Sequence, residues 1–233
     1  MDWLLAQPHA TKIVIAGNHD LFLDTSYSRR GAGTTAATTA TATTSDNNAE
    51  DRTVHWGDII YLQNTETTVT CANGRRLRIY GSPYSPRHGN WAFQYPRSEN
   101  VWNGQVPDDT DILITHGPPR AHLDLLHLGC VHLLRELWRV RPRLHVFGHV
   151  HEGAGTEWLQ FDALQDLYER VVVARGGVWG LARVAWVVLK MVVFCCCCRR
   201  RRRLSEAKCL LVNPAIVGGL RNQERRQPVR VTI

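Results

Sequence analysis

The sequence predicts a single α/β domain, and three observations lead to this fold class. Short apolar runs rich in Ile, Val and Leu occur at residues 12–16, 112–115 and 144–147, and each is followed by a loop that carries Asn or His. Uninterrupted apolar runs of this length suit strands that are buried on both faces of a sheet. Residues 131–138 have helical spacing between two of these runs. The chain has 233 residues, which is enough for one sizeable core.

The N-terminal part is predicted to hold the end of a helix, a strand and a disordered tract. Residues 1–9 have the pattern of a last helical turn that Pro8 ends, and Ile13–Ala16 is the first strand. Residues 31–50 are rich in Thr and Ala and contain almost no large apolar side chain. Such a tract cannot bury enough surface to offset its ordering entropy, so we expect a disordered surface insertion.

Three β-rich runs follow this tract: Ile59–Leu62, Thr67–Thr70 and Leu77–Tyr80. The pair Asn73-Gly74 lies between the second and third runs and is a strong hairpin signal, because both residues tolerate the backbone of a tight turn. The stretch from Gly81 to Gly89 is rich in Gly, Pro and Ser and is expected to be a loop.

The C-terminal part is predicted to alternate helix and strand. Val131, Leu134 and Trp138 form one helix face, and Arg141-Pro142 ends that helix. After the strand at 144–147, a second helical stretch begins near Phe161. Two strands are expected to close the chain, one at 209–212 and a polar-flanked one at the C-terminus.

Residues 171–208 stand apart as an apolar and basic helical insertion. Val184–Cys198 is apolar except for Lys190, and Arg199–Arg203 follow it. The uncharged run is shorter than the roughly 20 residues that cross a bilayer. One interpretation is peripheral membrane contact through 184–203, with arginines near anionic lipid and cysteines open to palmitoylation. The other is a partly buried helix with a basic, solvated end.

Charge and cysteine content limit the partners and the compartment. The net charge is +7, and the arginine run supplies five of these charges, which leaves +2 for the rest. This is a local cluster and not the basic face that nucleic-acid binding needs, so we expect no nucleic-acid partner. Seven cysteines, four of them adjacent, do not form a disulfide framework. With no signal-peptide pattern at the N-terminus, a reducing, cytoplasmic location is expected, and the oligomeric state stays open.

Metal-ligand side chains follow three of the predicted strands. Asn18 follows the first, His116 follows the run at 112–115, and His149 and His151 follow the run at 144–147. Oxygen and imidazole ligands suit Mn, Fe or Zn. Two such ions about 3.5–4 Å apart can clamp a phosphoryl group and activate a bridging water. The turning loop at 148–151 can direct its two imidazoles to different ions.

Two further side chains of the first cluster are candidate catalytic residues. His19 lies beside the ligand Asn18, where it can act as a proton donor or stabilise phosphate charge. Asp20 could orient the imidazole of His19. Each signal is weak alone, but their order and their shared position at strand ends are specific.

These segments resemble the calcineurin-like metallophosphoesterase superfamily, and most closely its branch similar to the brain 239 type, which has many fungal members. The segments that carry the resemblance are Lys12–Asp20, Arg78–Pro83, Trp91–Phe93, Ile114–Pro119, His145–Glu152 and Val212–Ala215. The similarity covers nearly the whole chain apart from the Thr/Ala tract and residues 171–208, which makes 1–233 one phosphoesterase domain with two insertions.

The resemblance implies a four-layer α-β-β-α sandwich, two divalent metal ions and hydrolysis of phosphate esters. Phosphodiesters such as cyclic nucleotides are typical substrates of this branch. Carried over residue by residue, Asn18, His116 and His149 would bind one metal and His151 the other. His19 would be the catalytic histidine, and the partner would be a small phosphate-ester substrate.

The chain also departs from the family pattern. In the family, an Asp-x-His and a Gly-Asp motif precede the Asn-His motif, and this chain begins after them. We therefore expect the first strands to be absent, half of the binuclear site to remain, and the second metal to be weak or missing. Gly57-Asp58 lies in the wrong order and is expected to start a hairpin strand. The alternative function is a catalytically impaired homologue that acts as a binding or membrane-associated module.

Other histidines are expected to lie outside the site. His145 alternates with the apolar residues of its strand and should face away from the metal ligands. Three histidines around the predicted helix are expected to be solvated: His122, His127 and His132. Four ring-bearing residues belong to a loop that either lines a substrate mouth or packs on itself: Tyr84, His88, Trp91 and Phe93.

Overall fold

The computed structural model describes residues 2–27, 54–174, 177–197, 207–218 and 223–233, with backbone alone at 174, 191 and 194–197. The predicted disordered tract at 31–50 and the arginine run at 199–203 lie outside the described residues. Cys198 lies there too, and the side chains of Cys195–Cys197 are not described.

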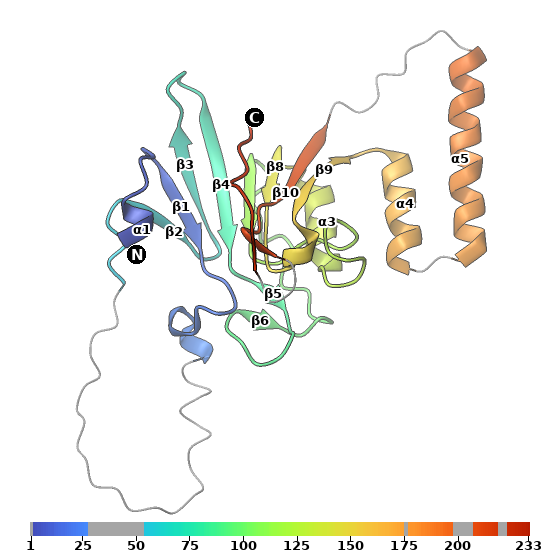
Figure 1. Ribbon diagram of the computed structural model, residues 1–233. Coiled ribbons are helices and arrows are strands. Elements are labelled where there is room, and N and C mark those ends of the chain that lie inside the picture. The colour runs from blue at the N-terminus through green and yellow to red at the C-terminus, as the bar shows by residue number, and fades with distance from the viewer. Residues whose placement is uncertain (1, 28–53, 175–176, 198–206, 219–222) are drawn as a thin grey trace, which may run out of the picture.

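A six-stranded mixed sheet forms the centre of the molecule (Figure 1). In spatial order its strands are β3 (Thr65–Thr70), β4 (Arg76–Ser82), β7 (Ile112–Thr115), β8 (Leu144–Val146), β10 (Lys208–Asn213) and β9 (Gly155–Gln160). The four middle strands are parallel, and the two edge strands are antiparallel to their neighbours. The sheet edge where the parallel strands end is therefore where their following loops meet.

A second, two-stranded parallel sheet covers one face of the large sheet. It pairs β1 (Lys12–Ile15) with β2 (Ile59–Leu62) in the register Lys12 to Ile59. Leu62 and Ile15 come so close to Gly81 of β4 that a Cβ there would lie 2.5 Å from the Cβ of Leu62. Gly81 therefore allows the two sheets to approach each other.

A helix covers the opposite face of the large sheet. It is α3 (Val131–Val140), and α4 (Ala163–Ala174) lies next to it, with the single-turn helix α1 (Asp2–Leu5) outside the two-stranded sheet. Leu113 of β7 packs with Leu133 and Leu137 of α3, whereas its neighbours Ile112 and Ile114 face β1 and β2. The alternation follows from the period of two in a strand. The layers appear in the predicted α-β-β-α order.

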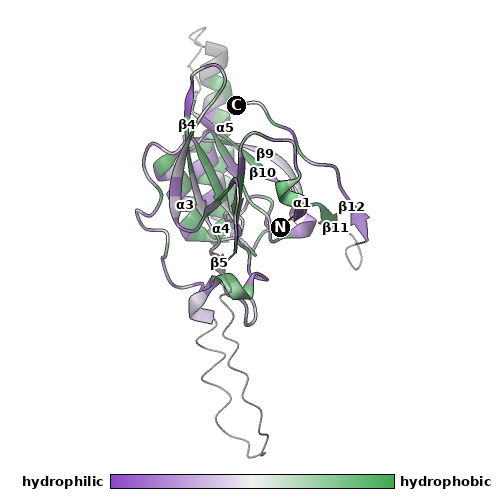
Figure 2. Ribbon diagram, turned by 90° about the vertical axis from the view of Figure 1, so that its left-hand side faces the viewer, coloured by the Kyte–Doolittle hydropathy of each residue, from purple (hydrophilic) through white to green (hydrophobic). Residues whose placement is uncertain are grey.

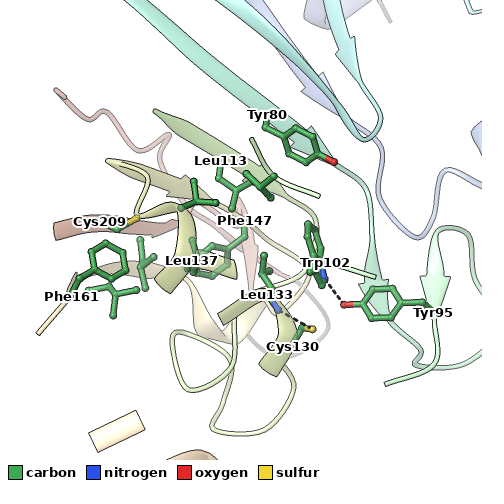
Figure 3. Packing of buried hydrophobic residues seen from close by; sticks show 14 residues of the cluster. Tyr80, Tyr95, Trp102, Leu113, Cys130, Leu133, Leu137, Phe147, Phe161 and Cys209 are labelled. Atoms are coloured by element: carbon green, nitrogen blue, oxygen red, sulfur yellow. Dashed lines mark hydrogen bonds between the residues drawn. The ribbon is translucent and has the colours of Figure 1, made fainter. Parts of the chain in front are cut away.

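The core between α3 and the sheet is closely packed (Figure 3). Leu137 is fully buried, and Trp102 donates a hydrogen bond from Nε1 to the hydroxyl of Tyr95 at 2.9 Å. At the N-terminus of α3 the Cys130 Sγ accepts from Leu133 N at 3.4 Å, which caps the helix. The helix ends at Arg141-Pro142 as predicted, and Arg141 adopts a left-handed conformation there.

The smaller elements differ from the prediction in three places. Strand β9 was not predicted, although it pairs antiparallel with β10 along its whole length. The predicted loop after β4 contains a short strand pair, β5 (Ser85–Pro86) with β6 (Gln94–Tyr95). The predicted C-terminal strand is replaced by another short pair, β11 (Val217–Gly218) with β12 (Glu224–Arg225). Single-turn helices η1 (Leu21–Leu23) and η2 (His151–Gly153) follow the two histidine motifs.

The predicted helical insertion forms the end of α4 and all of α5 (Gly177–Cys197). Figure 1 shows α5 outermost, with α4 between it and the sheet. Within the described residues, no helix combines the length and the apolar character that spanning a bilayer requires.

Candidate metal centre

Three strand ends bring the predicted ligands of the first metal together. Asn18 follows β1, His116 directly follows β7, and His149 follows β8. The backbone N of Gly148 donates to the carbonyl of His116 at 3.0 Å, which joins the loops after β7 and β8. Because β1 belongs to the two-stranded sheet and β7 and β8 to the large one, the fold brings ligands from both sheets together.

The donor atoms of the three side chains lie within hydrogen-bonding distance of each other. Asn18 Oδ1 is 2.7 Å from His116 Nε2 and 3.2 Å from His149 Nδ1, and the two imidazole nitrogens are 3.0 Å apart. The two rings meet edge to face, with centroids 4.8 Å apart. An ion that holds adjacent octahedral ligands at about 2.1 Å places their atoms about 3.0 Å apart. The three atoms thus have the spacing of one face of a single ion's coordination shell.

Both imidazoles are neutral near pH 7. Burial, together with the charges of His149 and His19, lowers the pKa of His116 to about 3. Burial and the charges of His88 and His151 lower the pKa of His149 to about 4. A neutral imidazole keeps a free lone pair, which is the form that binds metal ions.

Local backbone geometry creates this convergence. His149 has a positive φ of 65°, an uncommon conformation for a residue with a side chain. Asn213 supports the same loop, because its buried Nδ2 donates to the carbonyl of Val150 at 2.8 Å. Gly17 leaves room for His116, since a Cβ on Gly17 would lie 2.8 Å from Cε1 of that ring.

The remaining predicted site residues surround this cluster. His151 starts η2, and its charge contributes to the lowered pKa values of His116 and His149. His19 is exposed and directly follows Asn18 in the chain. Asp20 accepts a hydrogen bond at Oδ2 from Gly17 N at 2.7 Å, so it holds the turn. Its predicted orientation of His19 stays a prediction.

The loop after β4 packs against the segment that follows β1. Trp91 lies with its ring centroid 4.5 Å from that of His19, and His88 is exposed nearby. Phe93 is buried, and its backbone N donates to the buried carboxylate of Asp24 at 2.8 Å. The packing interpretation therefore holds for Phe93, and the interpretation of this loop as a substrate mouth stays a prediction.

Sequence reasoning missed Asp24, which anchors this loop, and Arg97, whose charge also lowers the pKa of His149. Neither belongs to a recognisable motif, so only the fold brings them to the site. Asp58 lies in the turn before β2, and its carboxylate pairs with Lys12 Nζ at 2.5 Å. The expected hairpin strand was wrong here, because β2 pairs in parallel with β1.

One histidine prediction was wrong. His122 is completely buried and lies between two carboxylates, Glu157 at 2.9 Å and Glu169 at 3.0 Å. His127 is exposed, as predicted. His145 is buried and contacts Thr115 Oγ1 at 2.8 Å through Nε2, apart from the ligand cluster.

A cavity of about 380 Å³ opens beside the cluster at the carboxyl ends of the parallel strands. Gly17, Asp20 and His116 line one side, and Pro214 and Ala215 line the other. Across the described ranges, no group of three or more His, Cys, Asp or Glu side chains could hold a metal ion. The donor set here is instead two imidazoles and the amide oxygen of Asn18, which fits one ion.

Comparison with known families agrees with this geometry. The model of the calcineurin-like phosphoesterase family matches residues 1–153, which contain all of the candidate ligands. The chain belongs to the calcineurin-like phosphoesterase family. Membership of this family suggests hydrolysis of phosphate esters and the use of divalent metal ions.

Several curated proteins are similar to this calcineurin-like phosphoesterase. Metallophosphoesterase domain-containing protein 1 of Homo sapiens is 41% identical over 164 residues, covering 66% of this chain and 48% of that protein. The UPF0046 protein K07C11.7 of Caenorhabditis elegans is 34% identical over 161 residues, covering 64% of this chain and 48% of that protein. The chain thus spans about half the length of these two relatives.

A third relative matches almost the whole chain. A protein of Emericella nidulans named probable rhamnogalacturonate lyase C is 41% identical over 233 residues, covering 99% of this chain but 20% of that protein. The matched part is a fifth of that protein's length, so its name refers to a much longer chain. Among solved structures, TT1561 of Thermus thermophilus matches 46% of this chain and 47% of its own, with 16% identity and a TM-score of 0.29, too distant to bear on the fold.

Proposed function

We propose that this calcineurin-like phosphoesterase hydrolyses phosphodiesters with the help of a divalent metal ion. The observation that carries the proposal is the convergence of Asn18 Oδ1, His116 Nε2 and His149 Nδ1 at separations of 2.7–3.2 Å. Three polar side chains from three separate strand ends meet at this point, beside a cavity large enough for a phosphate ester.

In this proposal, Asn18, His116 and His149 hold one ion, and His151 lies toward a second. Imidazole and amide ligands suit Mn, Fe or Zn. A bound ion would polarise a phosphoryl oxygen and lower the pKa of a water molecule. The chain's own part is to present neutral imidazoles, fixed in place by packing against Gly17 and by the loop that Asn213 holds.

His19 is the proposed proton donor to the leaving group. It is exposed at the mouth, so its imidazole can reach a substrate that enters the cavity. Trp91 restricts its ring from one side, with the centroids 4.5 Å apart. Arg97 adds positive charge that can attract an anionic phosphodiester.

A second candidate is a homologue that binds one ion and turns over slowly or not at all. The donor set favours it, because the described side chains offer three ligands to one ion and one, His151, to another. The number of ions bound at saturation distinguishes the two candidates.

The proposal is tested by metal analysis together with turnover of bis(p-nitrophenyl) phosphate, after loading with Mn²⁺ or Zn²⁺. Near two equivalents of metal, with turnover that His149→Ala abolishes, are expected for the enzyme. His127→Ala changes an exposed histidine outside the site and should behave like the wild type. One equivalent or less, with no turnover of this diester, would reject the enzyme and leave the one-ion homologue.

His19 provides a separate test of the proton-donor role. His19→Asn should lower kcat by about 10²–10⁴-fold, the usual contribution of a general acid. The metal content should stay at the wild-type value, because His19 is not in the donor cluster. A loss of metal with this variant would instead make His19 a ligand.

A further inference from the structure

Helix α5 leaves many large apolar side chains uncovered. Trp179 is 86% exposed and Val178 is 80% exposed. Along the helix, the exposed apolar residues are Val178, Trp179, Leu181, Trp186, Val188, Leu189, Val192 and Val193. Figure 2 colours α5 largely as hydrophobic. Patches of this kind on a soluble protein mark binding surfaces.

The exposed residues lie on one side of the helix. At 100° per residue, all eight fall within an arc of about 180°. The opposite side faces α4: Gly180, Val184 and Val187 are half-buried there, and a Cβ on Gly180 would lie 2.9 Å from Cγ2 of Val171. We call the exposed arc the apolar face of α5.

Charged residues border this face on one side, and they are all basic. On the same helical wheel Arg183 and Lys190 lie next to each other, two turns apart, at one edge of the arc. Lys190 Nζ lies 5.1 Å from the centroid of the Trp186 ring. The sequence of α5 contains no Asp or Glu, and five arginines follow it at 199–203, outside the described residues.

A groove between α4 and α5 adjoins the apolar face. It has a volume of about 650 Å³. Leu167, Val171 and Trp179 give it apolar walls, and Arg170 and Arg183 add two guanidinium groups. Arg170 pairs with Asp166 of the same helix at 2.8 Å. Arg183 has no acidic residue on its own helix to pair with, because α5 contains no Asp or Glu.

We propose that the apolar face of α5 and this groove bind the surface of a bilayer that contains anionic phospholipids. An interfacial helix has an apolar half, tryptophans and a basic border, and lies in the plane of the membrane. Anionic headgroups complement the border of the apolar face, because the charges there are all positive. A helical protein partner usually binds a narrower apolar stripe, which is flanked by both positive and negative charges.

Vesicle flotation of the full chain tests the proposal. Wild type should float with vesicles of phosphatidylcholine and phosphatidylserine, and much less with phosphatidylcholine alone. The double variant Trp179→Ser/Trp186→Ser should lose binding by at least about tenfold, because interfacial affinity scales with buried apolar area. Trp3→Ser removes a 73% exposed tryptophan of α1 and should float as wild type does.

Charge variants separate the headgroup contribution from the apolar one. Arg183→Glu/Lys190→Glu should remove the preference for phosphatidylserine, whereas Arg183→Lys/Lys190→Arg should retain it. Helix content by circular dichroism, equal in all variants, excludes unfolding as the cause. His149→Ala should float like wild type, so the result is independent of phosphodiester hydrolysis.

Two outcomes overturn the proposal. One is a wild-type chain that does not float with phosphatidylserine vesicles, or a tryptophan double variant that floats equally well. The other is a concentration-dependent dimer of the wild type that the tryptophan variant abolishes, without any flotation. That outcome would assign the apolar face to a second copy of the chain.

Discussion

The close contact between Gly17 and His116 makes the donor cluster depend on a residue that has no side chain to bind a metal or react. Three atoms of the His116 ring lie within 2.8–3.3 Å of the position that a Cβ on Gly17 would occupy. The ring is held on its other side by Asn18 and His149. A methyl group at Gly17 would therefore push the ring out of the position in which its Nε2 meets the other two donors.

This contact leads to a prediction at the residue scale. Gly17→Ala should weaken binding of Mn²⁺ or Zn²⁺ by about 10–100-fold, the range seen when a residue that supports a ligand is changed. Gly148→Ala is the matched control, because a Cβ there has open space around it, and it should bind metal almost as wild type does. Calorimetric titration measures both. Equal metal affinities of the two variants would show that the His116 ring can move without loss of metal binding.

At the element scale, a buried ionic network ties together the elements that surround the core. His122, in the loop between β7 and α3, contacts Glu157 of β9 and Glu169 of α4. Glu169 also accepts a hydrogen bond at 2.6 Å from Trp138 Nε1 of α3. Burial favours the neutral imidazole, but the hydrogen bonds to both carboxylates raise the pKa of His122 to about 9.

The network predicts a pH-dependent stability. A histidine whose folded pKa is raised stabilises the fold fully below its unfolded pKa of about 6.5, and this stability is lost as pH rises through the folded pKa. The free energy of unfolding should thus fall by up to about 3 kcal/mol between pH 6.5 and a pH somewhat above 9. Urea unfolding at a series of pH values measures this fall.

Urea unfolding of His122→Gln at the same pH values isolates the contribution of His122 to the free energy of unfolding, because the variant lacks the titrating group. The difference between wild type and variant should shrink steadily as pH rises through this window. His127→Gln, which changes an exposed histidine, should follow the wild type at every pH. Parallel curves for wild type and His122→Gln would contradict the assignment of the charged imidazole to this network.

For the whole molecule, α5 lies outside the packed layers. Its half-buried residues face α4, and the apolar core forms between the two sheets and between the large sheet and α3. Cooperative stability comes mainly from buried apolar contacts, so α5 should contribute little to it.

The corresponding prediction concerns a replacement of 177–206 by a flexible Gly/Ser linker. The thermal midpoint should stay within about 4 °C of wild type, which corresponds to less than about 1–2 kcal/mol for a domain of this size. A replacement of 163–206 removes Glu169 as well and should lower the midpoint clearly. Differential scanning calorimetry compares them. A large decrease in the thermal midpoint on replacement of 177–206 would mean that α5 belongs to the part of the protein that unfolds cooperatively.

Much of the fold follows from local patterns in the sequence. The apolar runs at 112–115 and 144–147 became β7 and β8, because such runs are satisfied only inside a sheet covered on both faces. The pair Asn73-Gly74 became the turn between β3 and β4. Strand β9 was missed, because its residues Gly155–Gln160 do not form an apolar run and it lies at the sheet edge.

The candidate site was predictable where ligands follow strands, and not elsewhere. Asn18, His116 and His149 each come after a recognisable strand. His116 and His149 follow neighbouring parallel strands of the large sheet, and Asn18 follows β1 of the two-stranded sheet. The placement of Asp24 and Arg97 depends on how the loop after β4 folds back. His122 was predicted to be solvated from its position near the predicted helix, whereas its partners Glu157 and Glu169 lie 35 and 47 residues further along the chain.

The sequence by itself determined the family, the strands and the residues that could bind metal, because these depend on local composition and on the order of short motifs. Only the tertiary structure decided how those residues meet. The 2.7–3.2 Å spacing of the three donors, the space that Gly17 leaves for His116 and the burial of His122 between two carboxylates all arise from segments far apart in the chain. Distances between such segments are fixed by packing of the layers, and no local pattern encodes them.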